Sequence, residues 1–276
     1  MHRRSPKSLC GGLTAAVSQH LKDLEMKGVT IIPDVFSDKQ LDALRKDHDK
    51  IADIVADLTQ NHQPKKRVYE EDGKEVRSNY WVHEPSGRYV LECGVGRHDT
   101  DIYFDRGEAL RASYFHSNPC VVDIVNRAMK GPKVARPGLV FSSSGSSDQY
   151  WHRDVDKLFE NDPDRVKLVS EMSDFYFTCL IPLIDLTNAN GTTEFMLGTH
   201  RRPASSYASA KCAQFNVKCG SAVLFNGKIN HRGKGNPSKS DRPVLYVVYS
   251  KPWYNDYYRA GVPESTEKLH LVKGLD

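Results

Sequence analysis

The first sixty residues predict two helices with a short strand between them. Apolar residues recur at spacings of three and four over residues 13–27, which is the pattern of an amphipathic helix. These apolar positions are Leu13, Val17, Leu21 and Leu24. The segment GVTIIPDVF follows and predicts a strand. A second helix is expected to begin at Ser37, because Gln40 completes a capping box ahead of an apolar stripe.

The middle of the chain is polar before the helical spacing returns. Residues 61–88 are charged and rich in turn-forming residues, which predicts a long loop or a pair of irregular hairpins. Long ordered loops in compact domains are often functional. Residues 106–129 return to helical spacing, and Asn118 followed by Pro119 predicts a turn between two short helices.

From about residue 138 the pattern changes to short apolar strands separated by Gly, Asn, Pro and Ser. The expected strands are GLVFSS, QYWHRDVD, DFYFTCLIPL, TEFML, AQFNV, SAVLFN, INHRG and PVLYVVYS. Many short strands with turn signals between them are typical of a sandwich or barrel. The chain is therefore predicted to be α+β, with helices first and an antiparallel double sheet second.

Length and composition fit one globular domain. A chain of 276 residues with 39% apolar and 27% charged residues can bury a sizeable core. The net charge of +4 falls far short of the Lys/Arg stripe that nucleic-acid binding needs, so we expect no nucleic-acid partner. No stretch has the length of apolar residues needed to cross a bilayer, so we also expect no membrane partner.

The cysteines and the opening segment bear on location. The six cysteines are scattered without a C-x-x-C pair, which predicts free thiols in a reducing compartment and a cytoplasmic protein. They are Cys10, Cys93, Cys120, Cys179, Cys212 and Cys219. The opening MHRRSPKSLCGGLTAAV lacks the strongly apolar core of a signal peptide, and a cleaved organelle-targeting segment is the alternative interpretation.

Candidate chemistry lies in QYWHRDVD, residues 149–156. Residues two apart on a strand point to the same side, so His152 and Asp154 could converge on one ion. With eleven histidines in the chain, roughly one His-x-Asp is expected by chance. For this pair alone, an ordinary polar strand face is the better interpretation.

A second histidine changes this interpretation. His231 lies in NHRG, and Arg242 follows eleven residues later inside a predicted strand. Two imidazoles and one carboxylate form a facial triad that suits non-haem Fe(II) and leaves coordination positions open. An arginine can then hold a carboxylate through two parallel hydrogen bonds. A zinc hydrolase with the same ligands, or a jelly-roll binding or regulatory module with a degenerate site, are the alternatives.

Together with NGTTEFMLGTHR at residues 190–201, these residues resemble the phytanoyl-CoA dioxygenase-type (PhyH-type) Fe(II)/2-oxoglutarate oxygenases, over roughly residues 138–250. The resemblance implies one domain over residues 1–276. Its core would be a double-stranded β-helix, also called a jelly-roll or cupin-like fold, over about residues 138–252. A helical, lid-forming part of about residues 1–137 would flank this core. Relatives usually have proline where this chain has Leu197, a departure that affects a turn and no ligand.

The resemblance also implies roles for single residues. The implied ligands of Fe(II) are His152, Asp154 and His231. Arg242 would hold the distal carboxylate of 2-oxoglutarate. Thr193 aligns with a hydroxyl that supports the co-substrate, and Gln149 with a glutamine that faces it. His200, in a turn that relatives share, is interpreted as structural.

The implied reaction consumes 2-oxoglutarate and O2, releases succinate and oxidises an unactivated C–H bond. Hydroxylation, desaturation and oxidative cyclisation, as in kainoid-type biosynthetic enzymes, would use the same ligands. The carboxylate of Asp154 argues against halogenation, because halogenating relatives have a small residue there. Basic residues before residue 98, Arg77 and Arg88 among them, suggest a small anionic substrate, although a solvated charged loop explains them equally well. We expect a monomer or a weak homo-oligomer.

Overall fold

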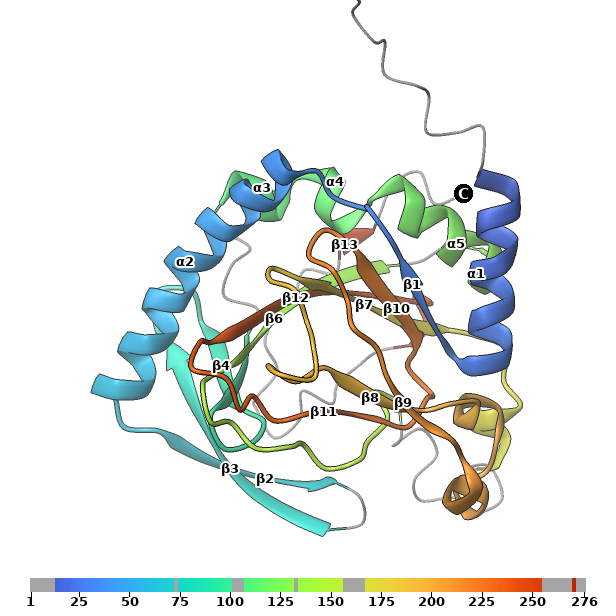
Figure 1. The fold of residues 1–276 in the computed structure, drawn as a ribbon. Helices are drawn as coiled ribbons and strands as arrows, with labels where there is room; N and C mark the ends of the chain where they lie inside the picture. The colour runs from blue at the N-terminus through green and yellow to red at the C-terminus, as the bar shows by residue number, and fades with distance from the viewer. Residues whose placement is uncertain are drawn as a thin grey trace, which may run out of the picture.

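A computed structural model describes most of the chain as two facing sheets beneath a layer of helices (Figure 1). The described residues are 13–71, 74–100, 107–131, 134–155, 167–254 and 270–271. The α-helices are α1 (Leu13–Lys27), α2 (Asp38–Asn61), α3 (Glu108–Arg111), α4 (Ser113–His116) and α5 (Pro119–Met129). Three described 3-10 helices are η2 (Lys167–Ser170), η3 (Thr199–Arg201) and η4 (Ala204–Ser209).

The large sheet is antiparallel and runs in the order β1-β10-β7-β12-β6-β5-β4-β3-β2, with β13 added beside β6. Its strands are β1 (Val29–Ile32), β2 (Lys65–Glu71), β3 (Lys74–His83), β4 (Arg88–Glu92), β5 (Arg97–Thr100), β6 (Val134–Ser142), β7 (Tyr176–Pro182), β10 (Ala222–Asn226), β12 (Arg242–Ser250) and β13 (His270–Leu271). The small sheet runs β11 (His231–Gly233), β8 (Thr193–Met196) and β9 (Cys212–Gln214).

The helices begin where the sequence predicts. The α1 helix has the expected bounds, and α2 starts after Ser37 with both hydrogen bonds of the capping box formed. Asn118 caps α5 by accepting a hydrogen bond from the Cys120 amide, and Pro119 takes the first helical position. The segment predicted to hold two short helices holds three, because α3 and α4 are separate single turns.

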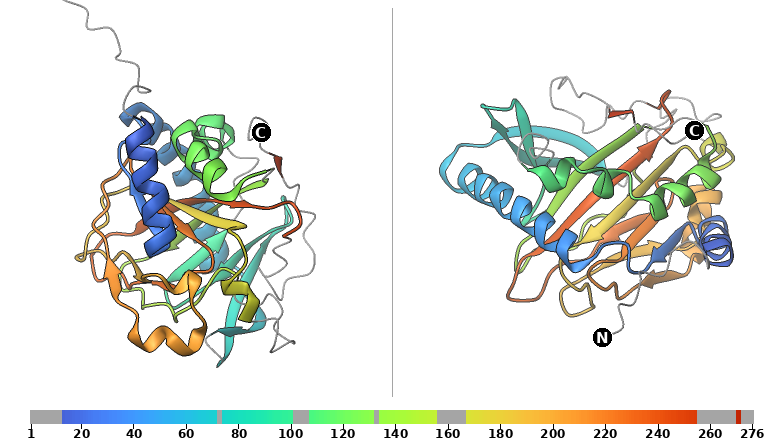
Figure 2. Two further views of the ribbon diagram at one scale, coloured as in Figure 1. Left: turned by 90° about the vertical axis from the view of Figure 1, so that its right-hand side faces the viewer. Right: turned by 90° about the horizontal axis from the view of Figure 1, so that it is seen from above.

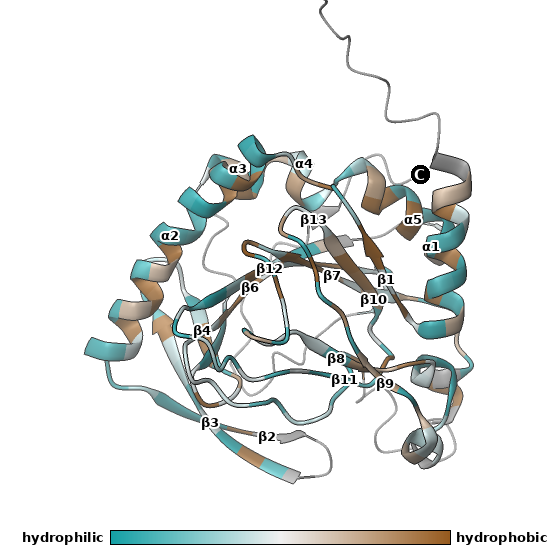
Figure 3. Cartoon of the chain, viewed as in Figure 1, coloured by the Kyte–Doolittle hydropathy of each residue, from teal (hydrophilic) through white to brown (hydrophobic). Residues whose placement is uncertain are grey.

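The helices cover one face of the large sheet, and the small sheet lies on its other side (Figure 2). Strand β12 illustrates the division, because its side chains alternate between the two faces. Leu245 and Val247 pack into the core shared with the helices, whereas Tyr246 and Val248 face the interior between the sheets. The apolar strands and the apolar stripes of the helices meet at this layer (Figure 3). The interior face is the one that carries the candidate chemistry.

Residues 61–88 form hairpins rather than a loop. Strands β2, β3 and β4 pair in succession and extend the large sheet beyond β5. The expected short strand and the hairpin alternative are thus both present in the first part of the chain, and their strands belong to the large sheet that was expected only in the second part. The division of the chain near residue 137 and the lid role of its first part stay predictions.

The strand predicted over QYWHRDVD is wrong. In its described part, residues 149–155, the segment pairs with β11 through one isolated antiparallel bridge, between His152 and His231, and a turn follows it. Side-chain oxygens of the segment and of the residue before it accept hydrogen bonds from backbone amides that would donate to backbone carbonyls in a longer β-ladder. Gln149 Oε1 accepts from the Gly233 amide at 2.9 Å, and Asp148 Oδ1 accepts from the Gly235 amide at 2.7 Å.

Two expectations about the chain concern its thiols and its ends. The described cysteines are free thiols, as predicted, and they are Cys93, Cys120, Cys179, Cys212 and Cys219. Cys10 and the opening segment up to residue 12 lie outside the described residues. None of the described helices combines the length and apolar character that a membrane span requires.

Candidate metal centre

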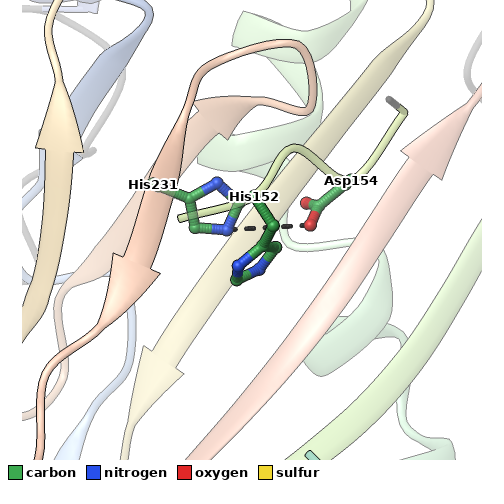
Figure 4. A group of neighbouring side chains, drawn as sticks. All are labelled: His152, Asp154 and His231. Atoms are coloured by element: carbon green, nitrogen blue, oxygen red, sulfur yellow. Dashed lines mark ion pairs between the residues drawn. The ribbon is translucent and has the colours of Figure 1, made fainter. Parts of the chain in front are cut away.

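His152, Asp154 and His231 converge at one point between the sheets (Figure 4). One possible ligand atom from each residue lies within 4.8 Å of the other two. The Nε2 atom of His231 is 3.6 Å from Asp154 Oδ1, and the two imidazole centroids are 4.4 Å apart. The three side chains that the sequence singled out are therefore neighbours.

Backbone hydrogen bonds bring the two segments together. The His152 amide donates to the His231 carbonyl at 2.9 Å, and the His231 amide donates to the His152 carbonyl at 2.8 Å. The Asp154 amide donates to the carbonyl of Gly227, in the turn between β10 and β11, at 2.9 Å. The irregular segment therefore achieves the convergence that strand alternation was expected to give.

Hydrogen bonds to both histidines fix which ring nitrogen carries the proton. His152 Nδ1 lies 3.0 Å from the Tyr150 carbonyl, and His231 Nδ1 lies 3.1 Å from the Ile229 carbonyl. A carbonyl oxygen only accepts, so each neutral ring is protonated at Nδ1 and has its lone pair on Nε2. Backbone carbonyls orient many metal-binding histidines in this way.

The carboxylate is oriented as well. Thr178 Oγ1 on β7 donates to Asp154 Oδ2 at 2.6 Å, which turns Oδ1 toward His231. With both rings neutral, the donor set is two imidazole nitrogens and one carboxylate oxygen on a single side. This set fits a divalent transition metal, Fe(II) in particular, with positions left for other ligands.

Burial favours the neutral form of the His231 ring, which is the form that can bind a metal. Loss of water around the ring lowers the pKa of His231 to about 4, with the charge of His152 acting in the same direction, against Asp154 and the hydrogen bond to Ile229. The imidazole is therefore neutral at pH 7, as coordination requires. The ring of Phe225 packs against it, with centroids 4.6 Å apart.

Arg242 is buried at the start of β12, 4% exposed, on the interior face. Among the described residues it donates to neutral oxygens, namely the Asn190 carbonyl, Ser142 Oγ and the Lys234 carbonyl, at 2.9, 3.1 and 2.9 Å. Burial, together with the nearby charge of Arg97, lowers the pKa of Arg242 to about 10, so the side chain is still a cation at pH 7.

Gly191 makes room for this arginine. Its φ is +77°, and a Cβ built there would lie 2.3 Å from Arg242 Nη1 and 2.1 Å from the Gly235 carbonyl oxygen. Any side chain at this position would collide with both. The glycine at the second position of the NGTTEFMLGTHR motif therefore has a local steric cause.

Arg97 is a second buried cation that the sequence did not single out as a site residue. Its Nη1 donates to Gln149 Oε1 at 3.1 Å, and its Nη2 donates to the Lys234 carbonyl at 2.8 Å. The strand register aligns Arg97, Ser142 and Arg242 across β5, β6 and β12. Both guanidinium groups therefore bind the same carbonyl oxygen. In the sequence, Arg97 was one of several basic residues in a polar region, and only strand pairing reveals its position.

The other predicted site residues have different surroundings. Thr193 lies opposite Gly233 on β8, on the same face as Phe195 and therefore toward the interior. Gln149 is held between Arg97 and Gly233 by its amide oxygen. The co-substrate roles of both residues stay predictions.

The structure does not bring Arg77 and Arg88 together with the triad. The side chain of Arg77 is 79% exposed and pairs with Glu75 at 2.9 Å. By strand alternation, Arg77 shares a face with Trp81 and Arg88 shares a face with Val90. Trp81 and Val90 belong to the core on the helix side of the large sheet.

His200 agrees with its structural interpretation. The ring is 1% exposed, and its Nε2 lies 3.1 Å from the Glu25 carbonyl near the end of α1. It therefore fastens the turn after β8 to the helical layer.

The sequence matches the phytanoyl-CoA dioxygenase (PhyH) family over residues 24–244. It is 35% identical over 133 residues to the Fe(II)/2-oxoglutarate-dependent dioxygenase nvfF of Aspergillus novofumigatus. That match covers 46% of this chain and 42% of nvfF. The chain thus spans less than half the length of the curated relatives it matches.

Solved structures of non-haem alpha-ketoglutarate-dependent enzymes share the fold. The alpha-ketoglutarate-dependent carbocyclase SnoK from nogalamycin biosynthesis superposes with a TM-score of 0.62 at 16% identity, covering 92% of this chain and 95% of that chain. The epimerase SnoN in complex with Fe3+, alpha ketoglutarate and nogalamycin RO gives a TM-score of 0.56 at 12% identity, covering 92% and 98%. The predicted double-stranded β-helix is confirmed. The family match covers most of the chain, which therefore belongs to the phytanoyl-CoA dioxygenase (PhyH) family.

Proposed function

We propose that this chain oxidises an unactivated C–H bond of a small organic substrate, using Fe(II), 2-oxoglutarate and O2. The observation that carries the proposal is the convergence of His152, Asp154 and His231, whose ring lone pairs and carboxylate oxygen meet within 4.8 Å. The family match and the buried cation at Arg242 support the same conclusion.

Each residue of the triad has a defined task in this proposal. His152 and His231 hold the metal through Nε2, while their Nδ1–H groups donate to backbone carbonyls that fix the ring planes. Asp154 binds through Oδ1, and Thr178 keeps Oδ2 turned away. The bound metal, with 2-oxoglutarate and O2, supplies the oxidising power for C–H cleavage. Phe225 excludes water from one side of His231.

The co-substrate site lies along the row Arg97, Ser142 and Arg242. Two cations buried beside neutral oxygens are costly, and a carboxylate that accepts two hydrogen bonds from a guanidinium offsets that cost. Arg242 therefore binds the distal carboxylate of 2-oxoglutarate, and Arg97 adds a second positive charge beside it. Gln149 positions Arg97, and Thr193 contributes a hydroxyl from the facing sheet.

Hydroxylation is the default reaction, and desaturation or oxidative cyclisation would use the same residues. The names of SnoK and SnoN, a carbocyclase and an epimerase, indicate that this fold supports several outcomes. An anionic substrate bound by Arg77 and Arg88 stays a hypothesis. Measuring the affinity of the Arg77→Ala and Arg88→Ala variants for candidate organic acids tests it, and unchanged binding in both variants removes it.

Two measurements test the proposed function. Anaerobic addition of Fe(II) and 2-oxoglutarate should produce the weak visible charge-transfer band of their chelate, and Asp154→Ala should lose turnover. Pools of organic acids, amino-acid derivatives and lipids, supplied with O2, should then reveal the substrate class by stimulating succinate release. A wild-type protein that shows no band would favour the zinc hydrolase or the degenerate binding module instead.

A further inference from the structure

Two of the three proposed metal ligands lie on a segment that has little regular structure. We call residues 148–154 the ligand arm. Backbone hydrogen bonds of the arm to β11 are those of the His152 bridge and one from the Gln149 amide to the Gly233 carbonyl, at 2.9 Å. The position of the arm must therefore depend on side-chain contacts as well.

Asp148 makes such contacts at the start of the arm. Its Oδ1 accepts from the Gly235 amide at 2.7 Å, and its Oδ2 accepts from Lys234 Nζ. Arg232 Nη1 lies 3.6 Å from the same Oδ2. Burial would raise the pKa of Asp148, but the hydrogen bonds and charges of these neighbours outweigh it and hold the pKa below its ordinary value.

Arg232, on β11, joins the arm to β8 of the small sheet. Its guanidinium lies over the Trp151 ring, 4.5 Å from the centroid, and its Nη2 lies 2.8 Å from Glu194 Oε2 on β8. Because strand side chains alternate, Arg232 points away from the interior that its neighbour His231 faces. These contacts therefore form on the outer face of the small sheet, behind the triad.

We propose that Asp148 is a positioning residue. Its contacts with Lys234 and Arg232 form a charge clamp, completed by Trp151 and Glu194, that holds the ligand arm in register with His231 and so sets the metal affinity. This inference rests on the proposed function, since it takes His152, Asp154 and His231 to be the metal ligands.

The physical reason is a population effect. His231 sits on a strand, whereas His152 and Asp154 sit on the arm. Apparent affinity falls in proportion to the fraction of molecules whose arm is in the binding geometry. Loss of contacts that orient metal ligands typically weakens metal binding by about 10-fold to 100-fold.

The test is titration of the metal-free protein with Mn(II), a divalent probe that needs no anaerobic handling. We expect Asp148→Asn to bind Mn(II) about 10-fold more weakly than the wild type. Asp185→Asn is the matched control, because Asp185 also accepts from a lysine, Lys218, at 2.6 Å and from the next amide, that of Cys219, at 2.8 Å. This control contacts no residue of the arm in the described structure, and its affinity should equal that of the wild type.

A second variant separates positioning from a simple charge effect. Removing Asp148 also removes a negative charge, which by itself would weaken the binding of a cation. Lys234→Gln removes a positive charge, so a pure charge effect predicts tighter Mn(II) binding, whereas loss of the clamp predicts weaker binding. We expect weaker binding, together with faster hydrogen exchange of the amides of residues 149–154 in both clamp variants.

The outcomes distinguish this inference from the proposed function. A wild type that does not bind Mn(II) would contradict the metal site itself. A wild type that binds while Lys234→Gln binds more tightly, or while both clamp variants match Asp185→Asn, would overturn the clamp and leave the metal site intact. If Asp148→Asn fails to fold, the sign of the Lys234→Gln effect still decides between the two explanations.

Discussion

His152 and His231 exchange both of their backbone hydrogen bonds across a single antiparallel bridge, which sets their rings 4.4 Å apart. The pair joins two segments that are distant in the sequence, so the candidate metal centre is complete only when the tertiary fold has formed. The contacts of this site and the burial of a distant histidine give four predictions that can be measured separately.

Thr178→Val should weaken Mn(II) binding about 10-fold, because it removes the 2.6 Å hydrogen bond that orients Asp154 while preserving the shape of the side chain. Equilibrium dialysis measures the effect. Thr59→Val is the control, since Thr59 Oγ1 also makes a hydrogen bond, to the Val55 carbonyl at 2.8 Å, but within α2. Equal affinities for the two variants would contradict the proposed orientation of Asp154.

Arg242→Ala should raise the KM for 2-oxoglutarate about 100-fold, which corresponds to about 3 kcal/mol for losing one partner of a buried charge pair. The kcat at saturating co-substrate should change less. Arg242→Lys should recover only part of the affinity, because an ammonium group cannot make two parallel hydrogen bonds to a carboxylate. Arg127→Lys, in an exposed pair with Asp123 on α5, should leave the KM unchanged. A similar KM for Arg242→Ala and wild type would remove Arg242 from the co-substrate site.

Gly191→Ala should both destabilise the protein and raise the KM for 2-oxoglutarate. The new Cβ would lie 2.1 Å from the Gly235 carbonyl oxygen and 2.3 Å from Arg242 Nη1. Gly145→Ala is a close control, because Gly145 has the same φ of +77° but a Cβ added there would have no atom within 4 Å. Backbone strain of about 1 kcal/mol is expected in both variants, and urea unfolding should show a larger loss for Gly191→Ala. Equal losses would mean that the close approach has no energetic cost.

The stability of the protein should fall as the pH drops from about 6.5 to about 4. Burial, together with the charge of Arg201, lowers the pKa of His200 to about 4, so in this window the unfolded state binds a proton that the folded state excludes. This pKa difference contributes about 3 kcal/mol to the free energy of unfolding above pH 6.5. The contribution is lost as the pH falls to about 4. His231 acts with the same sign.

Urea unfolding at several pH values tests this prediction through His200→Gln. The variant retains a donor for the Glu25 carbonyl but cannot take up the proton, so its stability should depend less on pH than that of the wild type. His62→Gln, at a side chain that is 57% exposed, should not change the slope. Identical slopes for His200→Gln and wild type would show that His200 does not contribute.

Sequence signals that act between neighbouring residues predicted correctly where helices begin. The capping box of Ser37 and Gln40 and the proline after Asn118 act within one helical turn, and both form as expected. The triad could also be predicted, because two histidines, an aspartate and an arginine at these spacings resemble one family. These features need no knowledge of how the strands pair.

The arm and Arg97 could not be predicted, because their positions depend on pairing between distant segments. QYWHRDVD has the composition of a strand. However, the Gln149 side chain accepts from the amide of Gly233 on β11, and the Asp148 side chain accepts from the amide of Gly235, just after β11. Arg97 lies in a short polar strand, and only its register with Ser142 reveals that it faces Arg242. Neither contact can be predicted from the residues that neighbour it in the sequence.

The Lys234 carbonyl oxygen that accepts from both Arg97 and Arg242 has a practical consequence for handling the protein. Two guanidinium groups meeting at one oxygen repel each other, and any compact dianion that reaches them relieves that repulsion. Sulfate or malonate in a buffer should therefore raise the melting temperature and compete with the natural keto acid. Assays in chloride salts of weakly coordinating amines would reveal the intrinsic co-substrate affinity, whereas sulfate-based buffers would lower the apparent affinity.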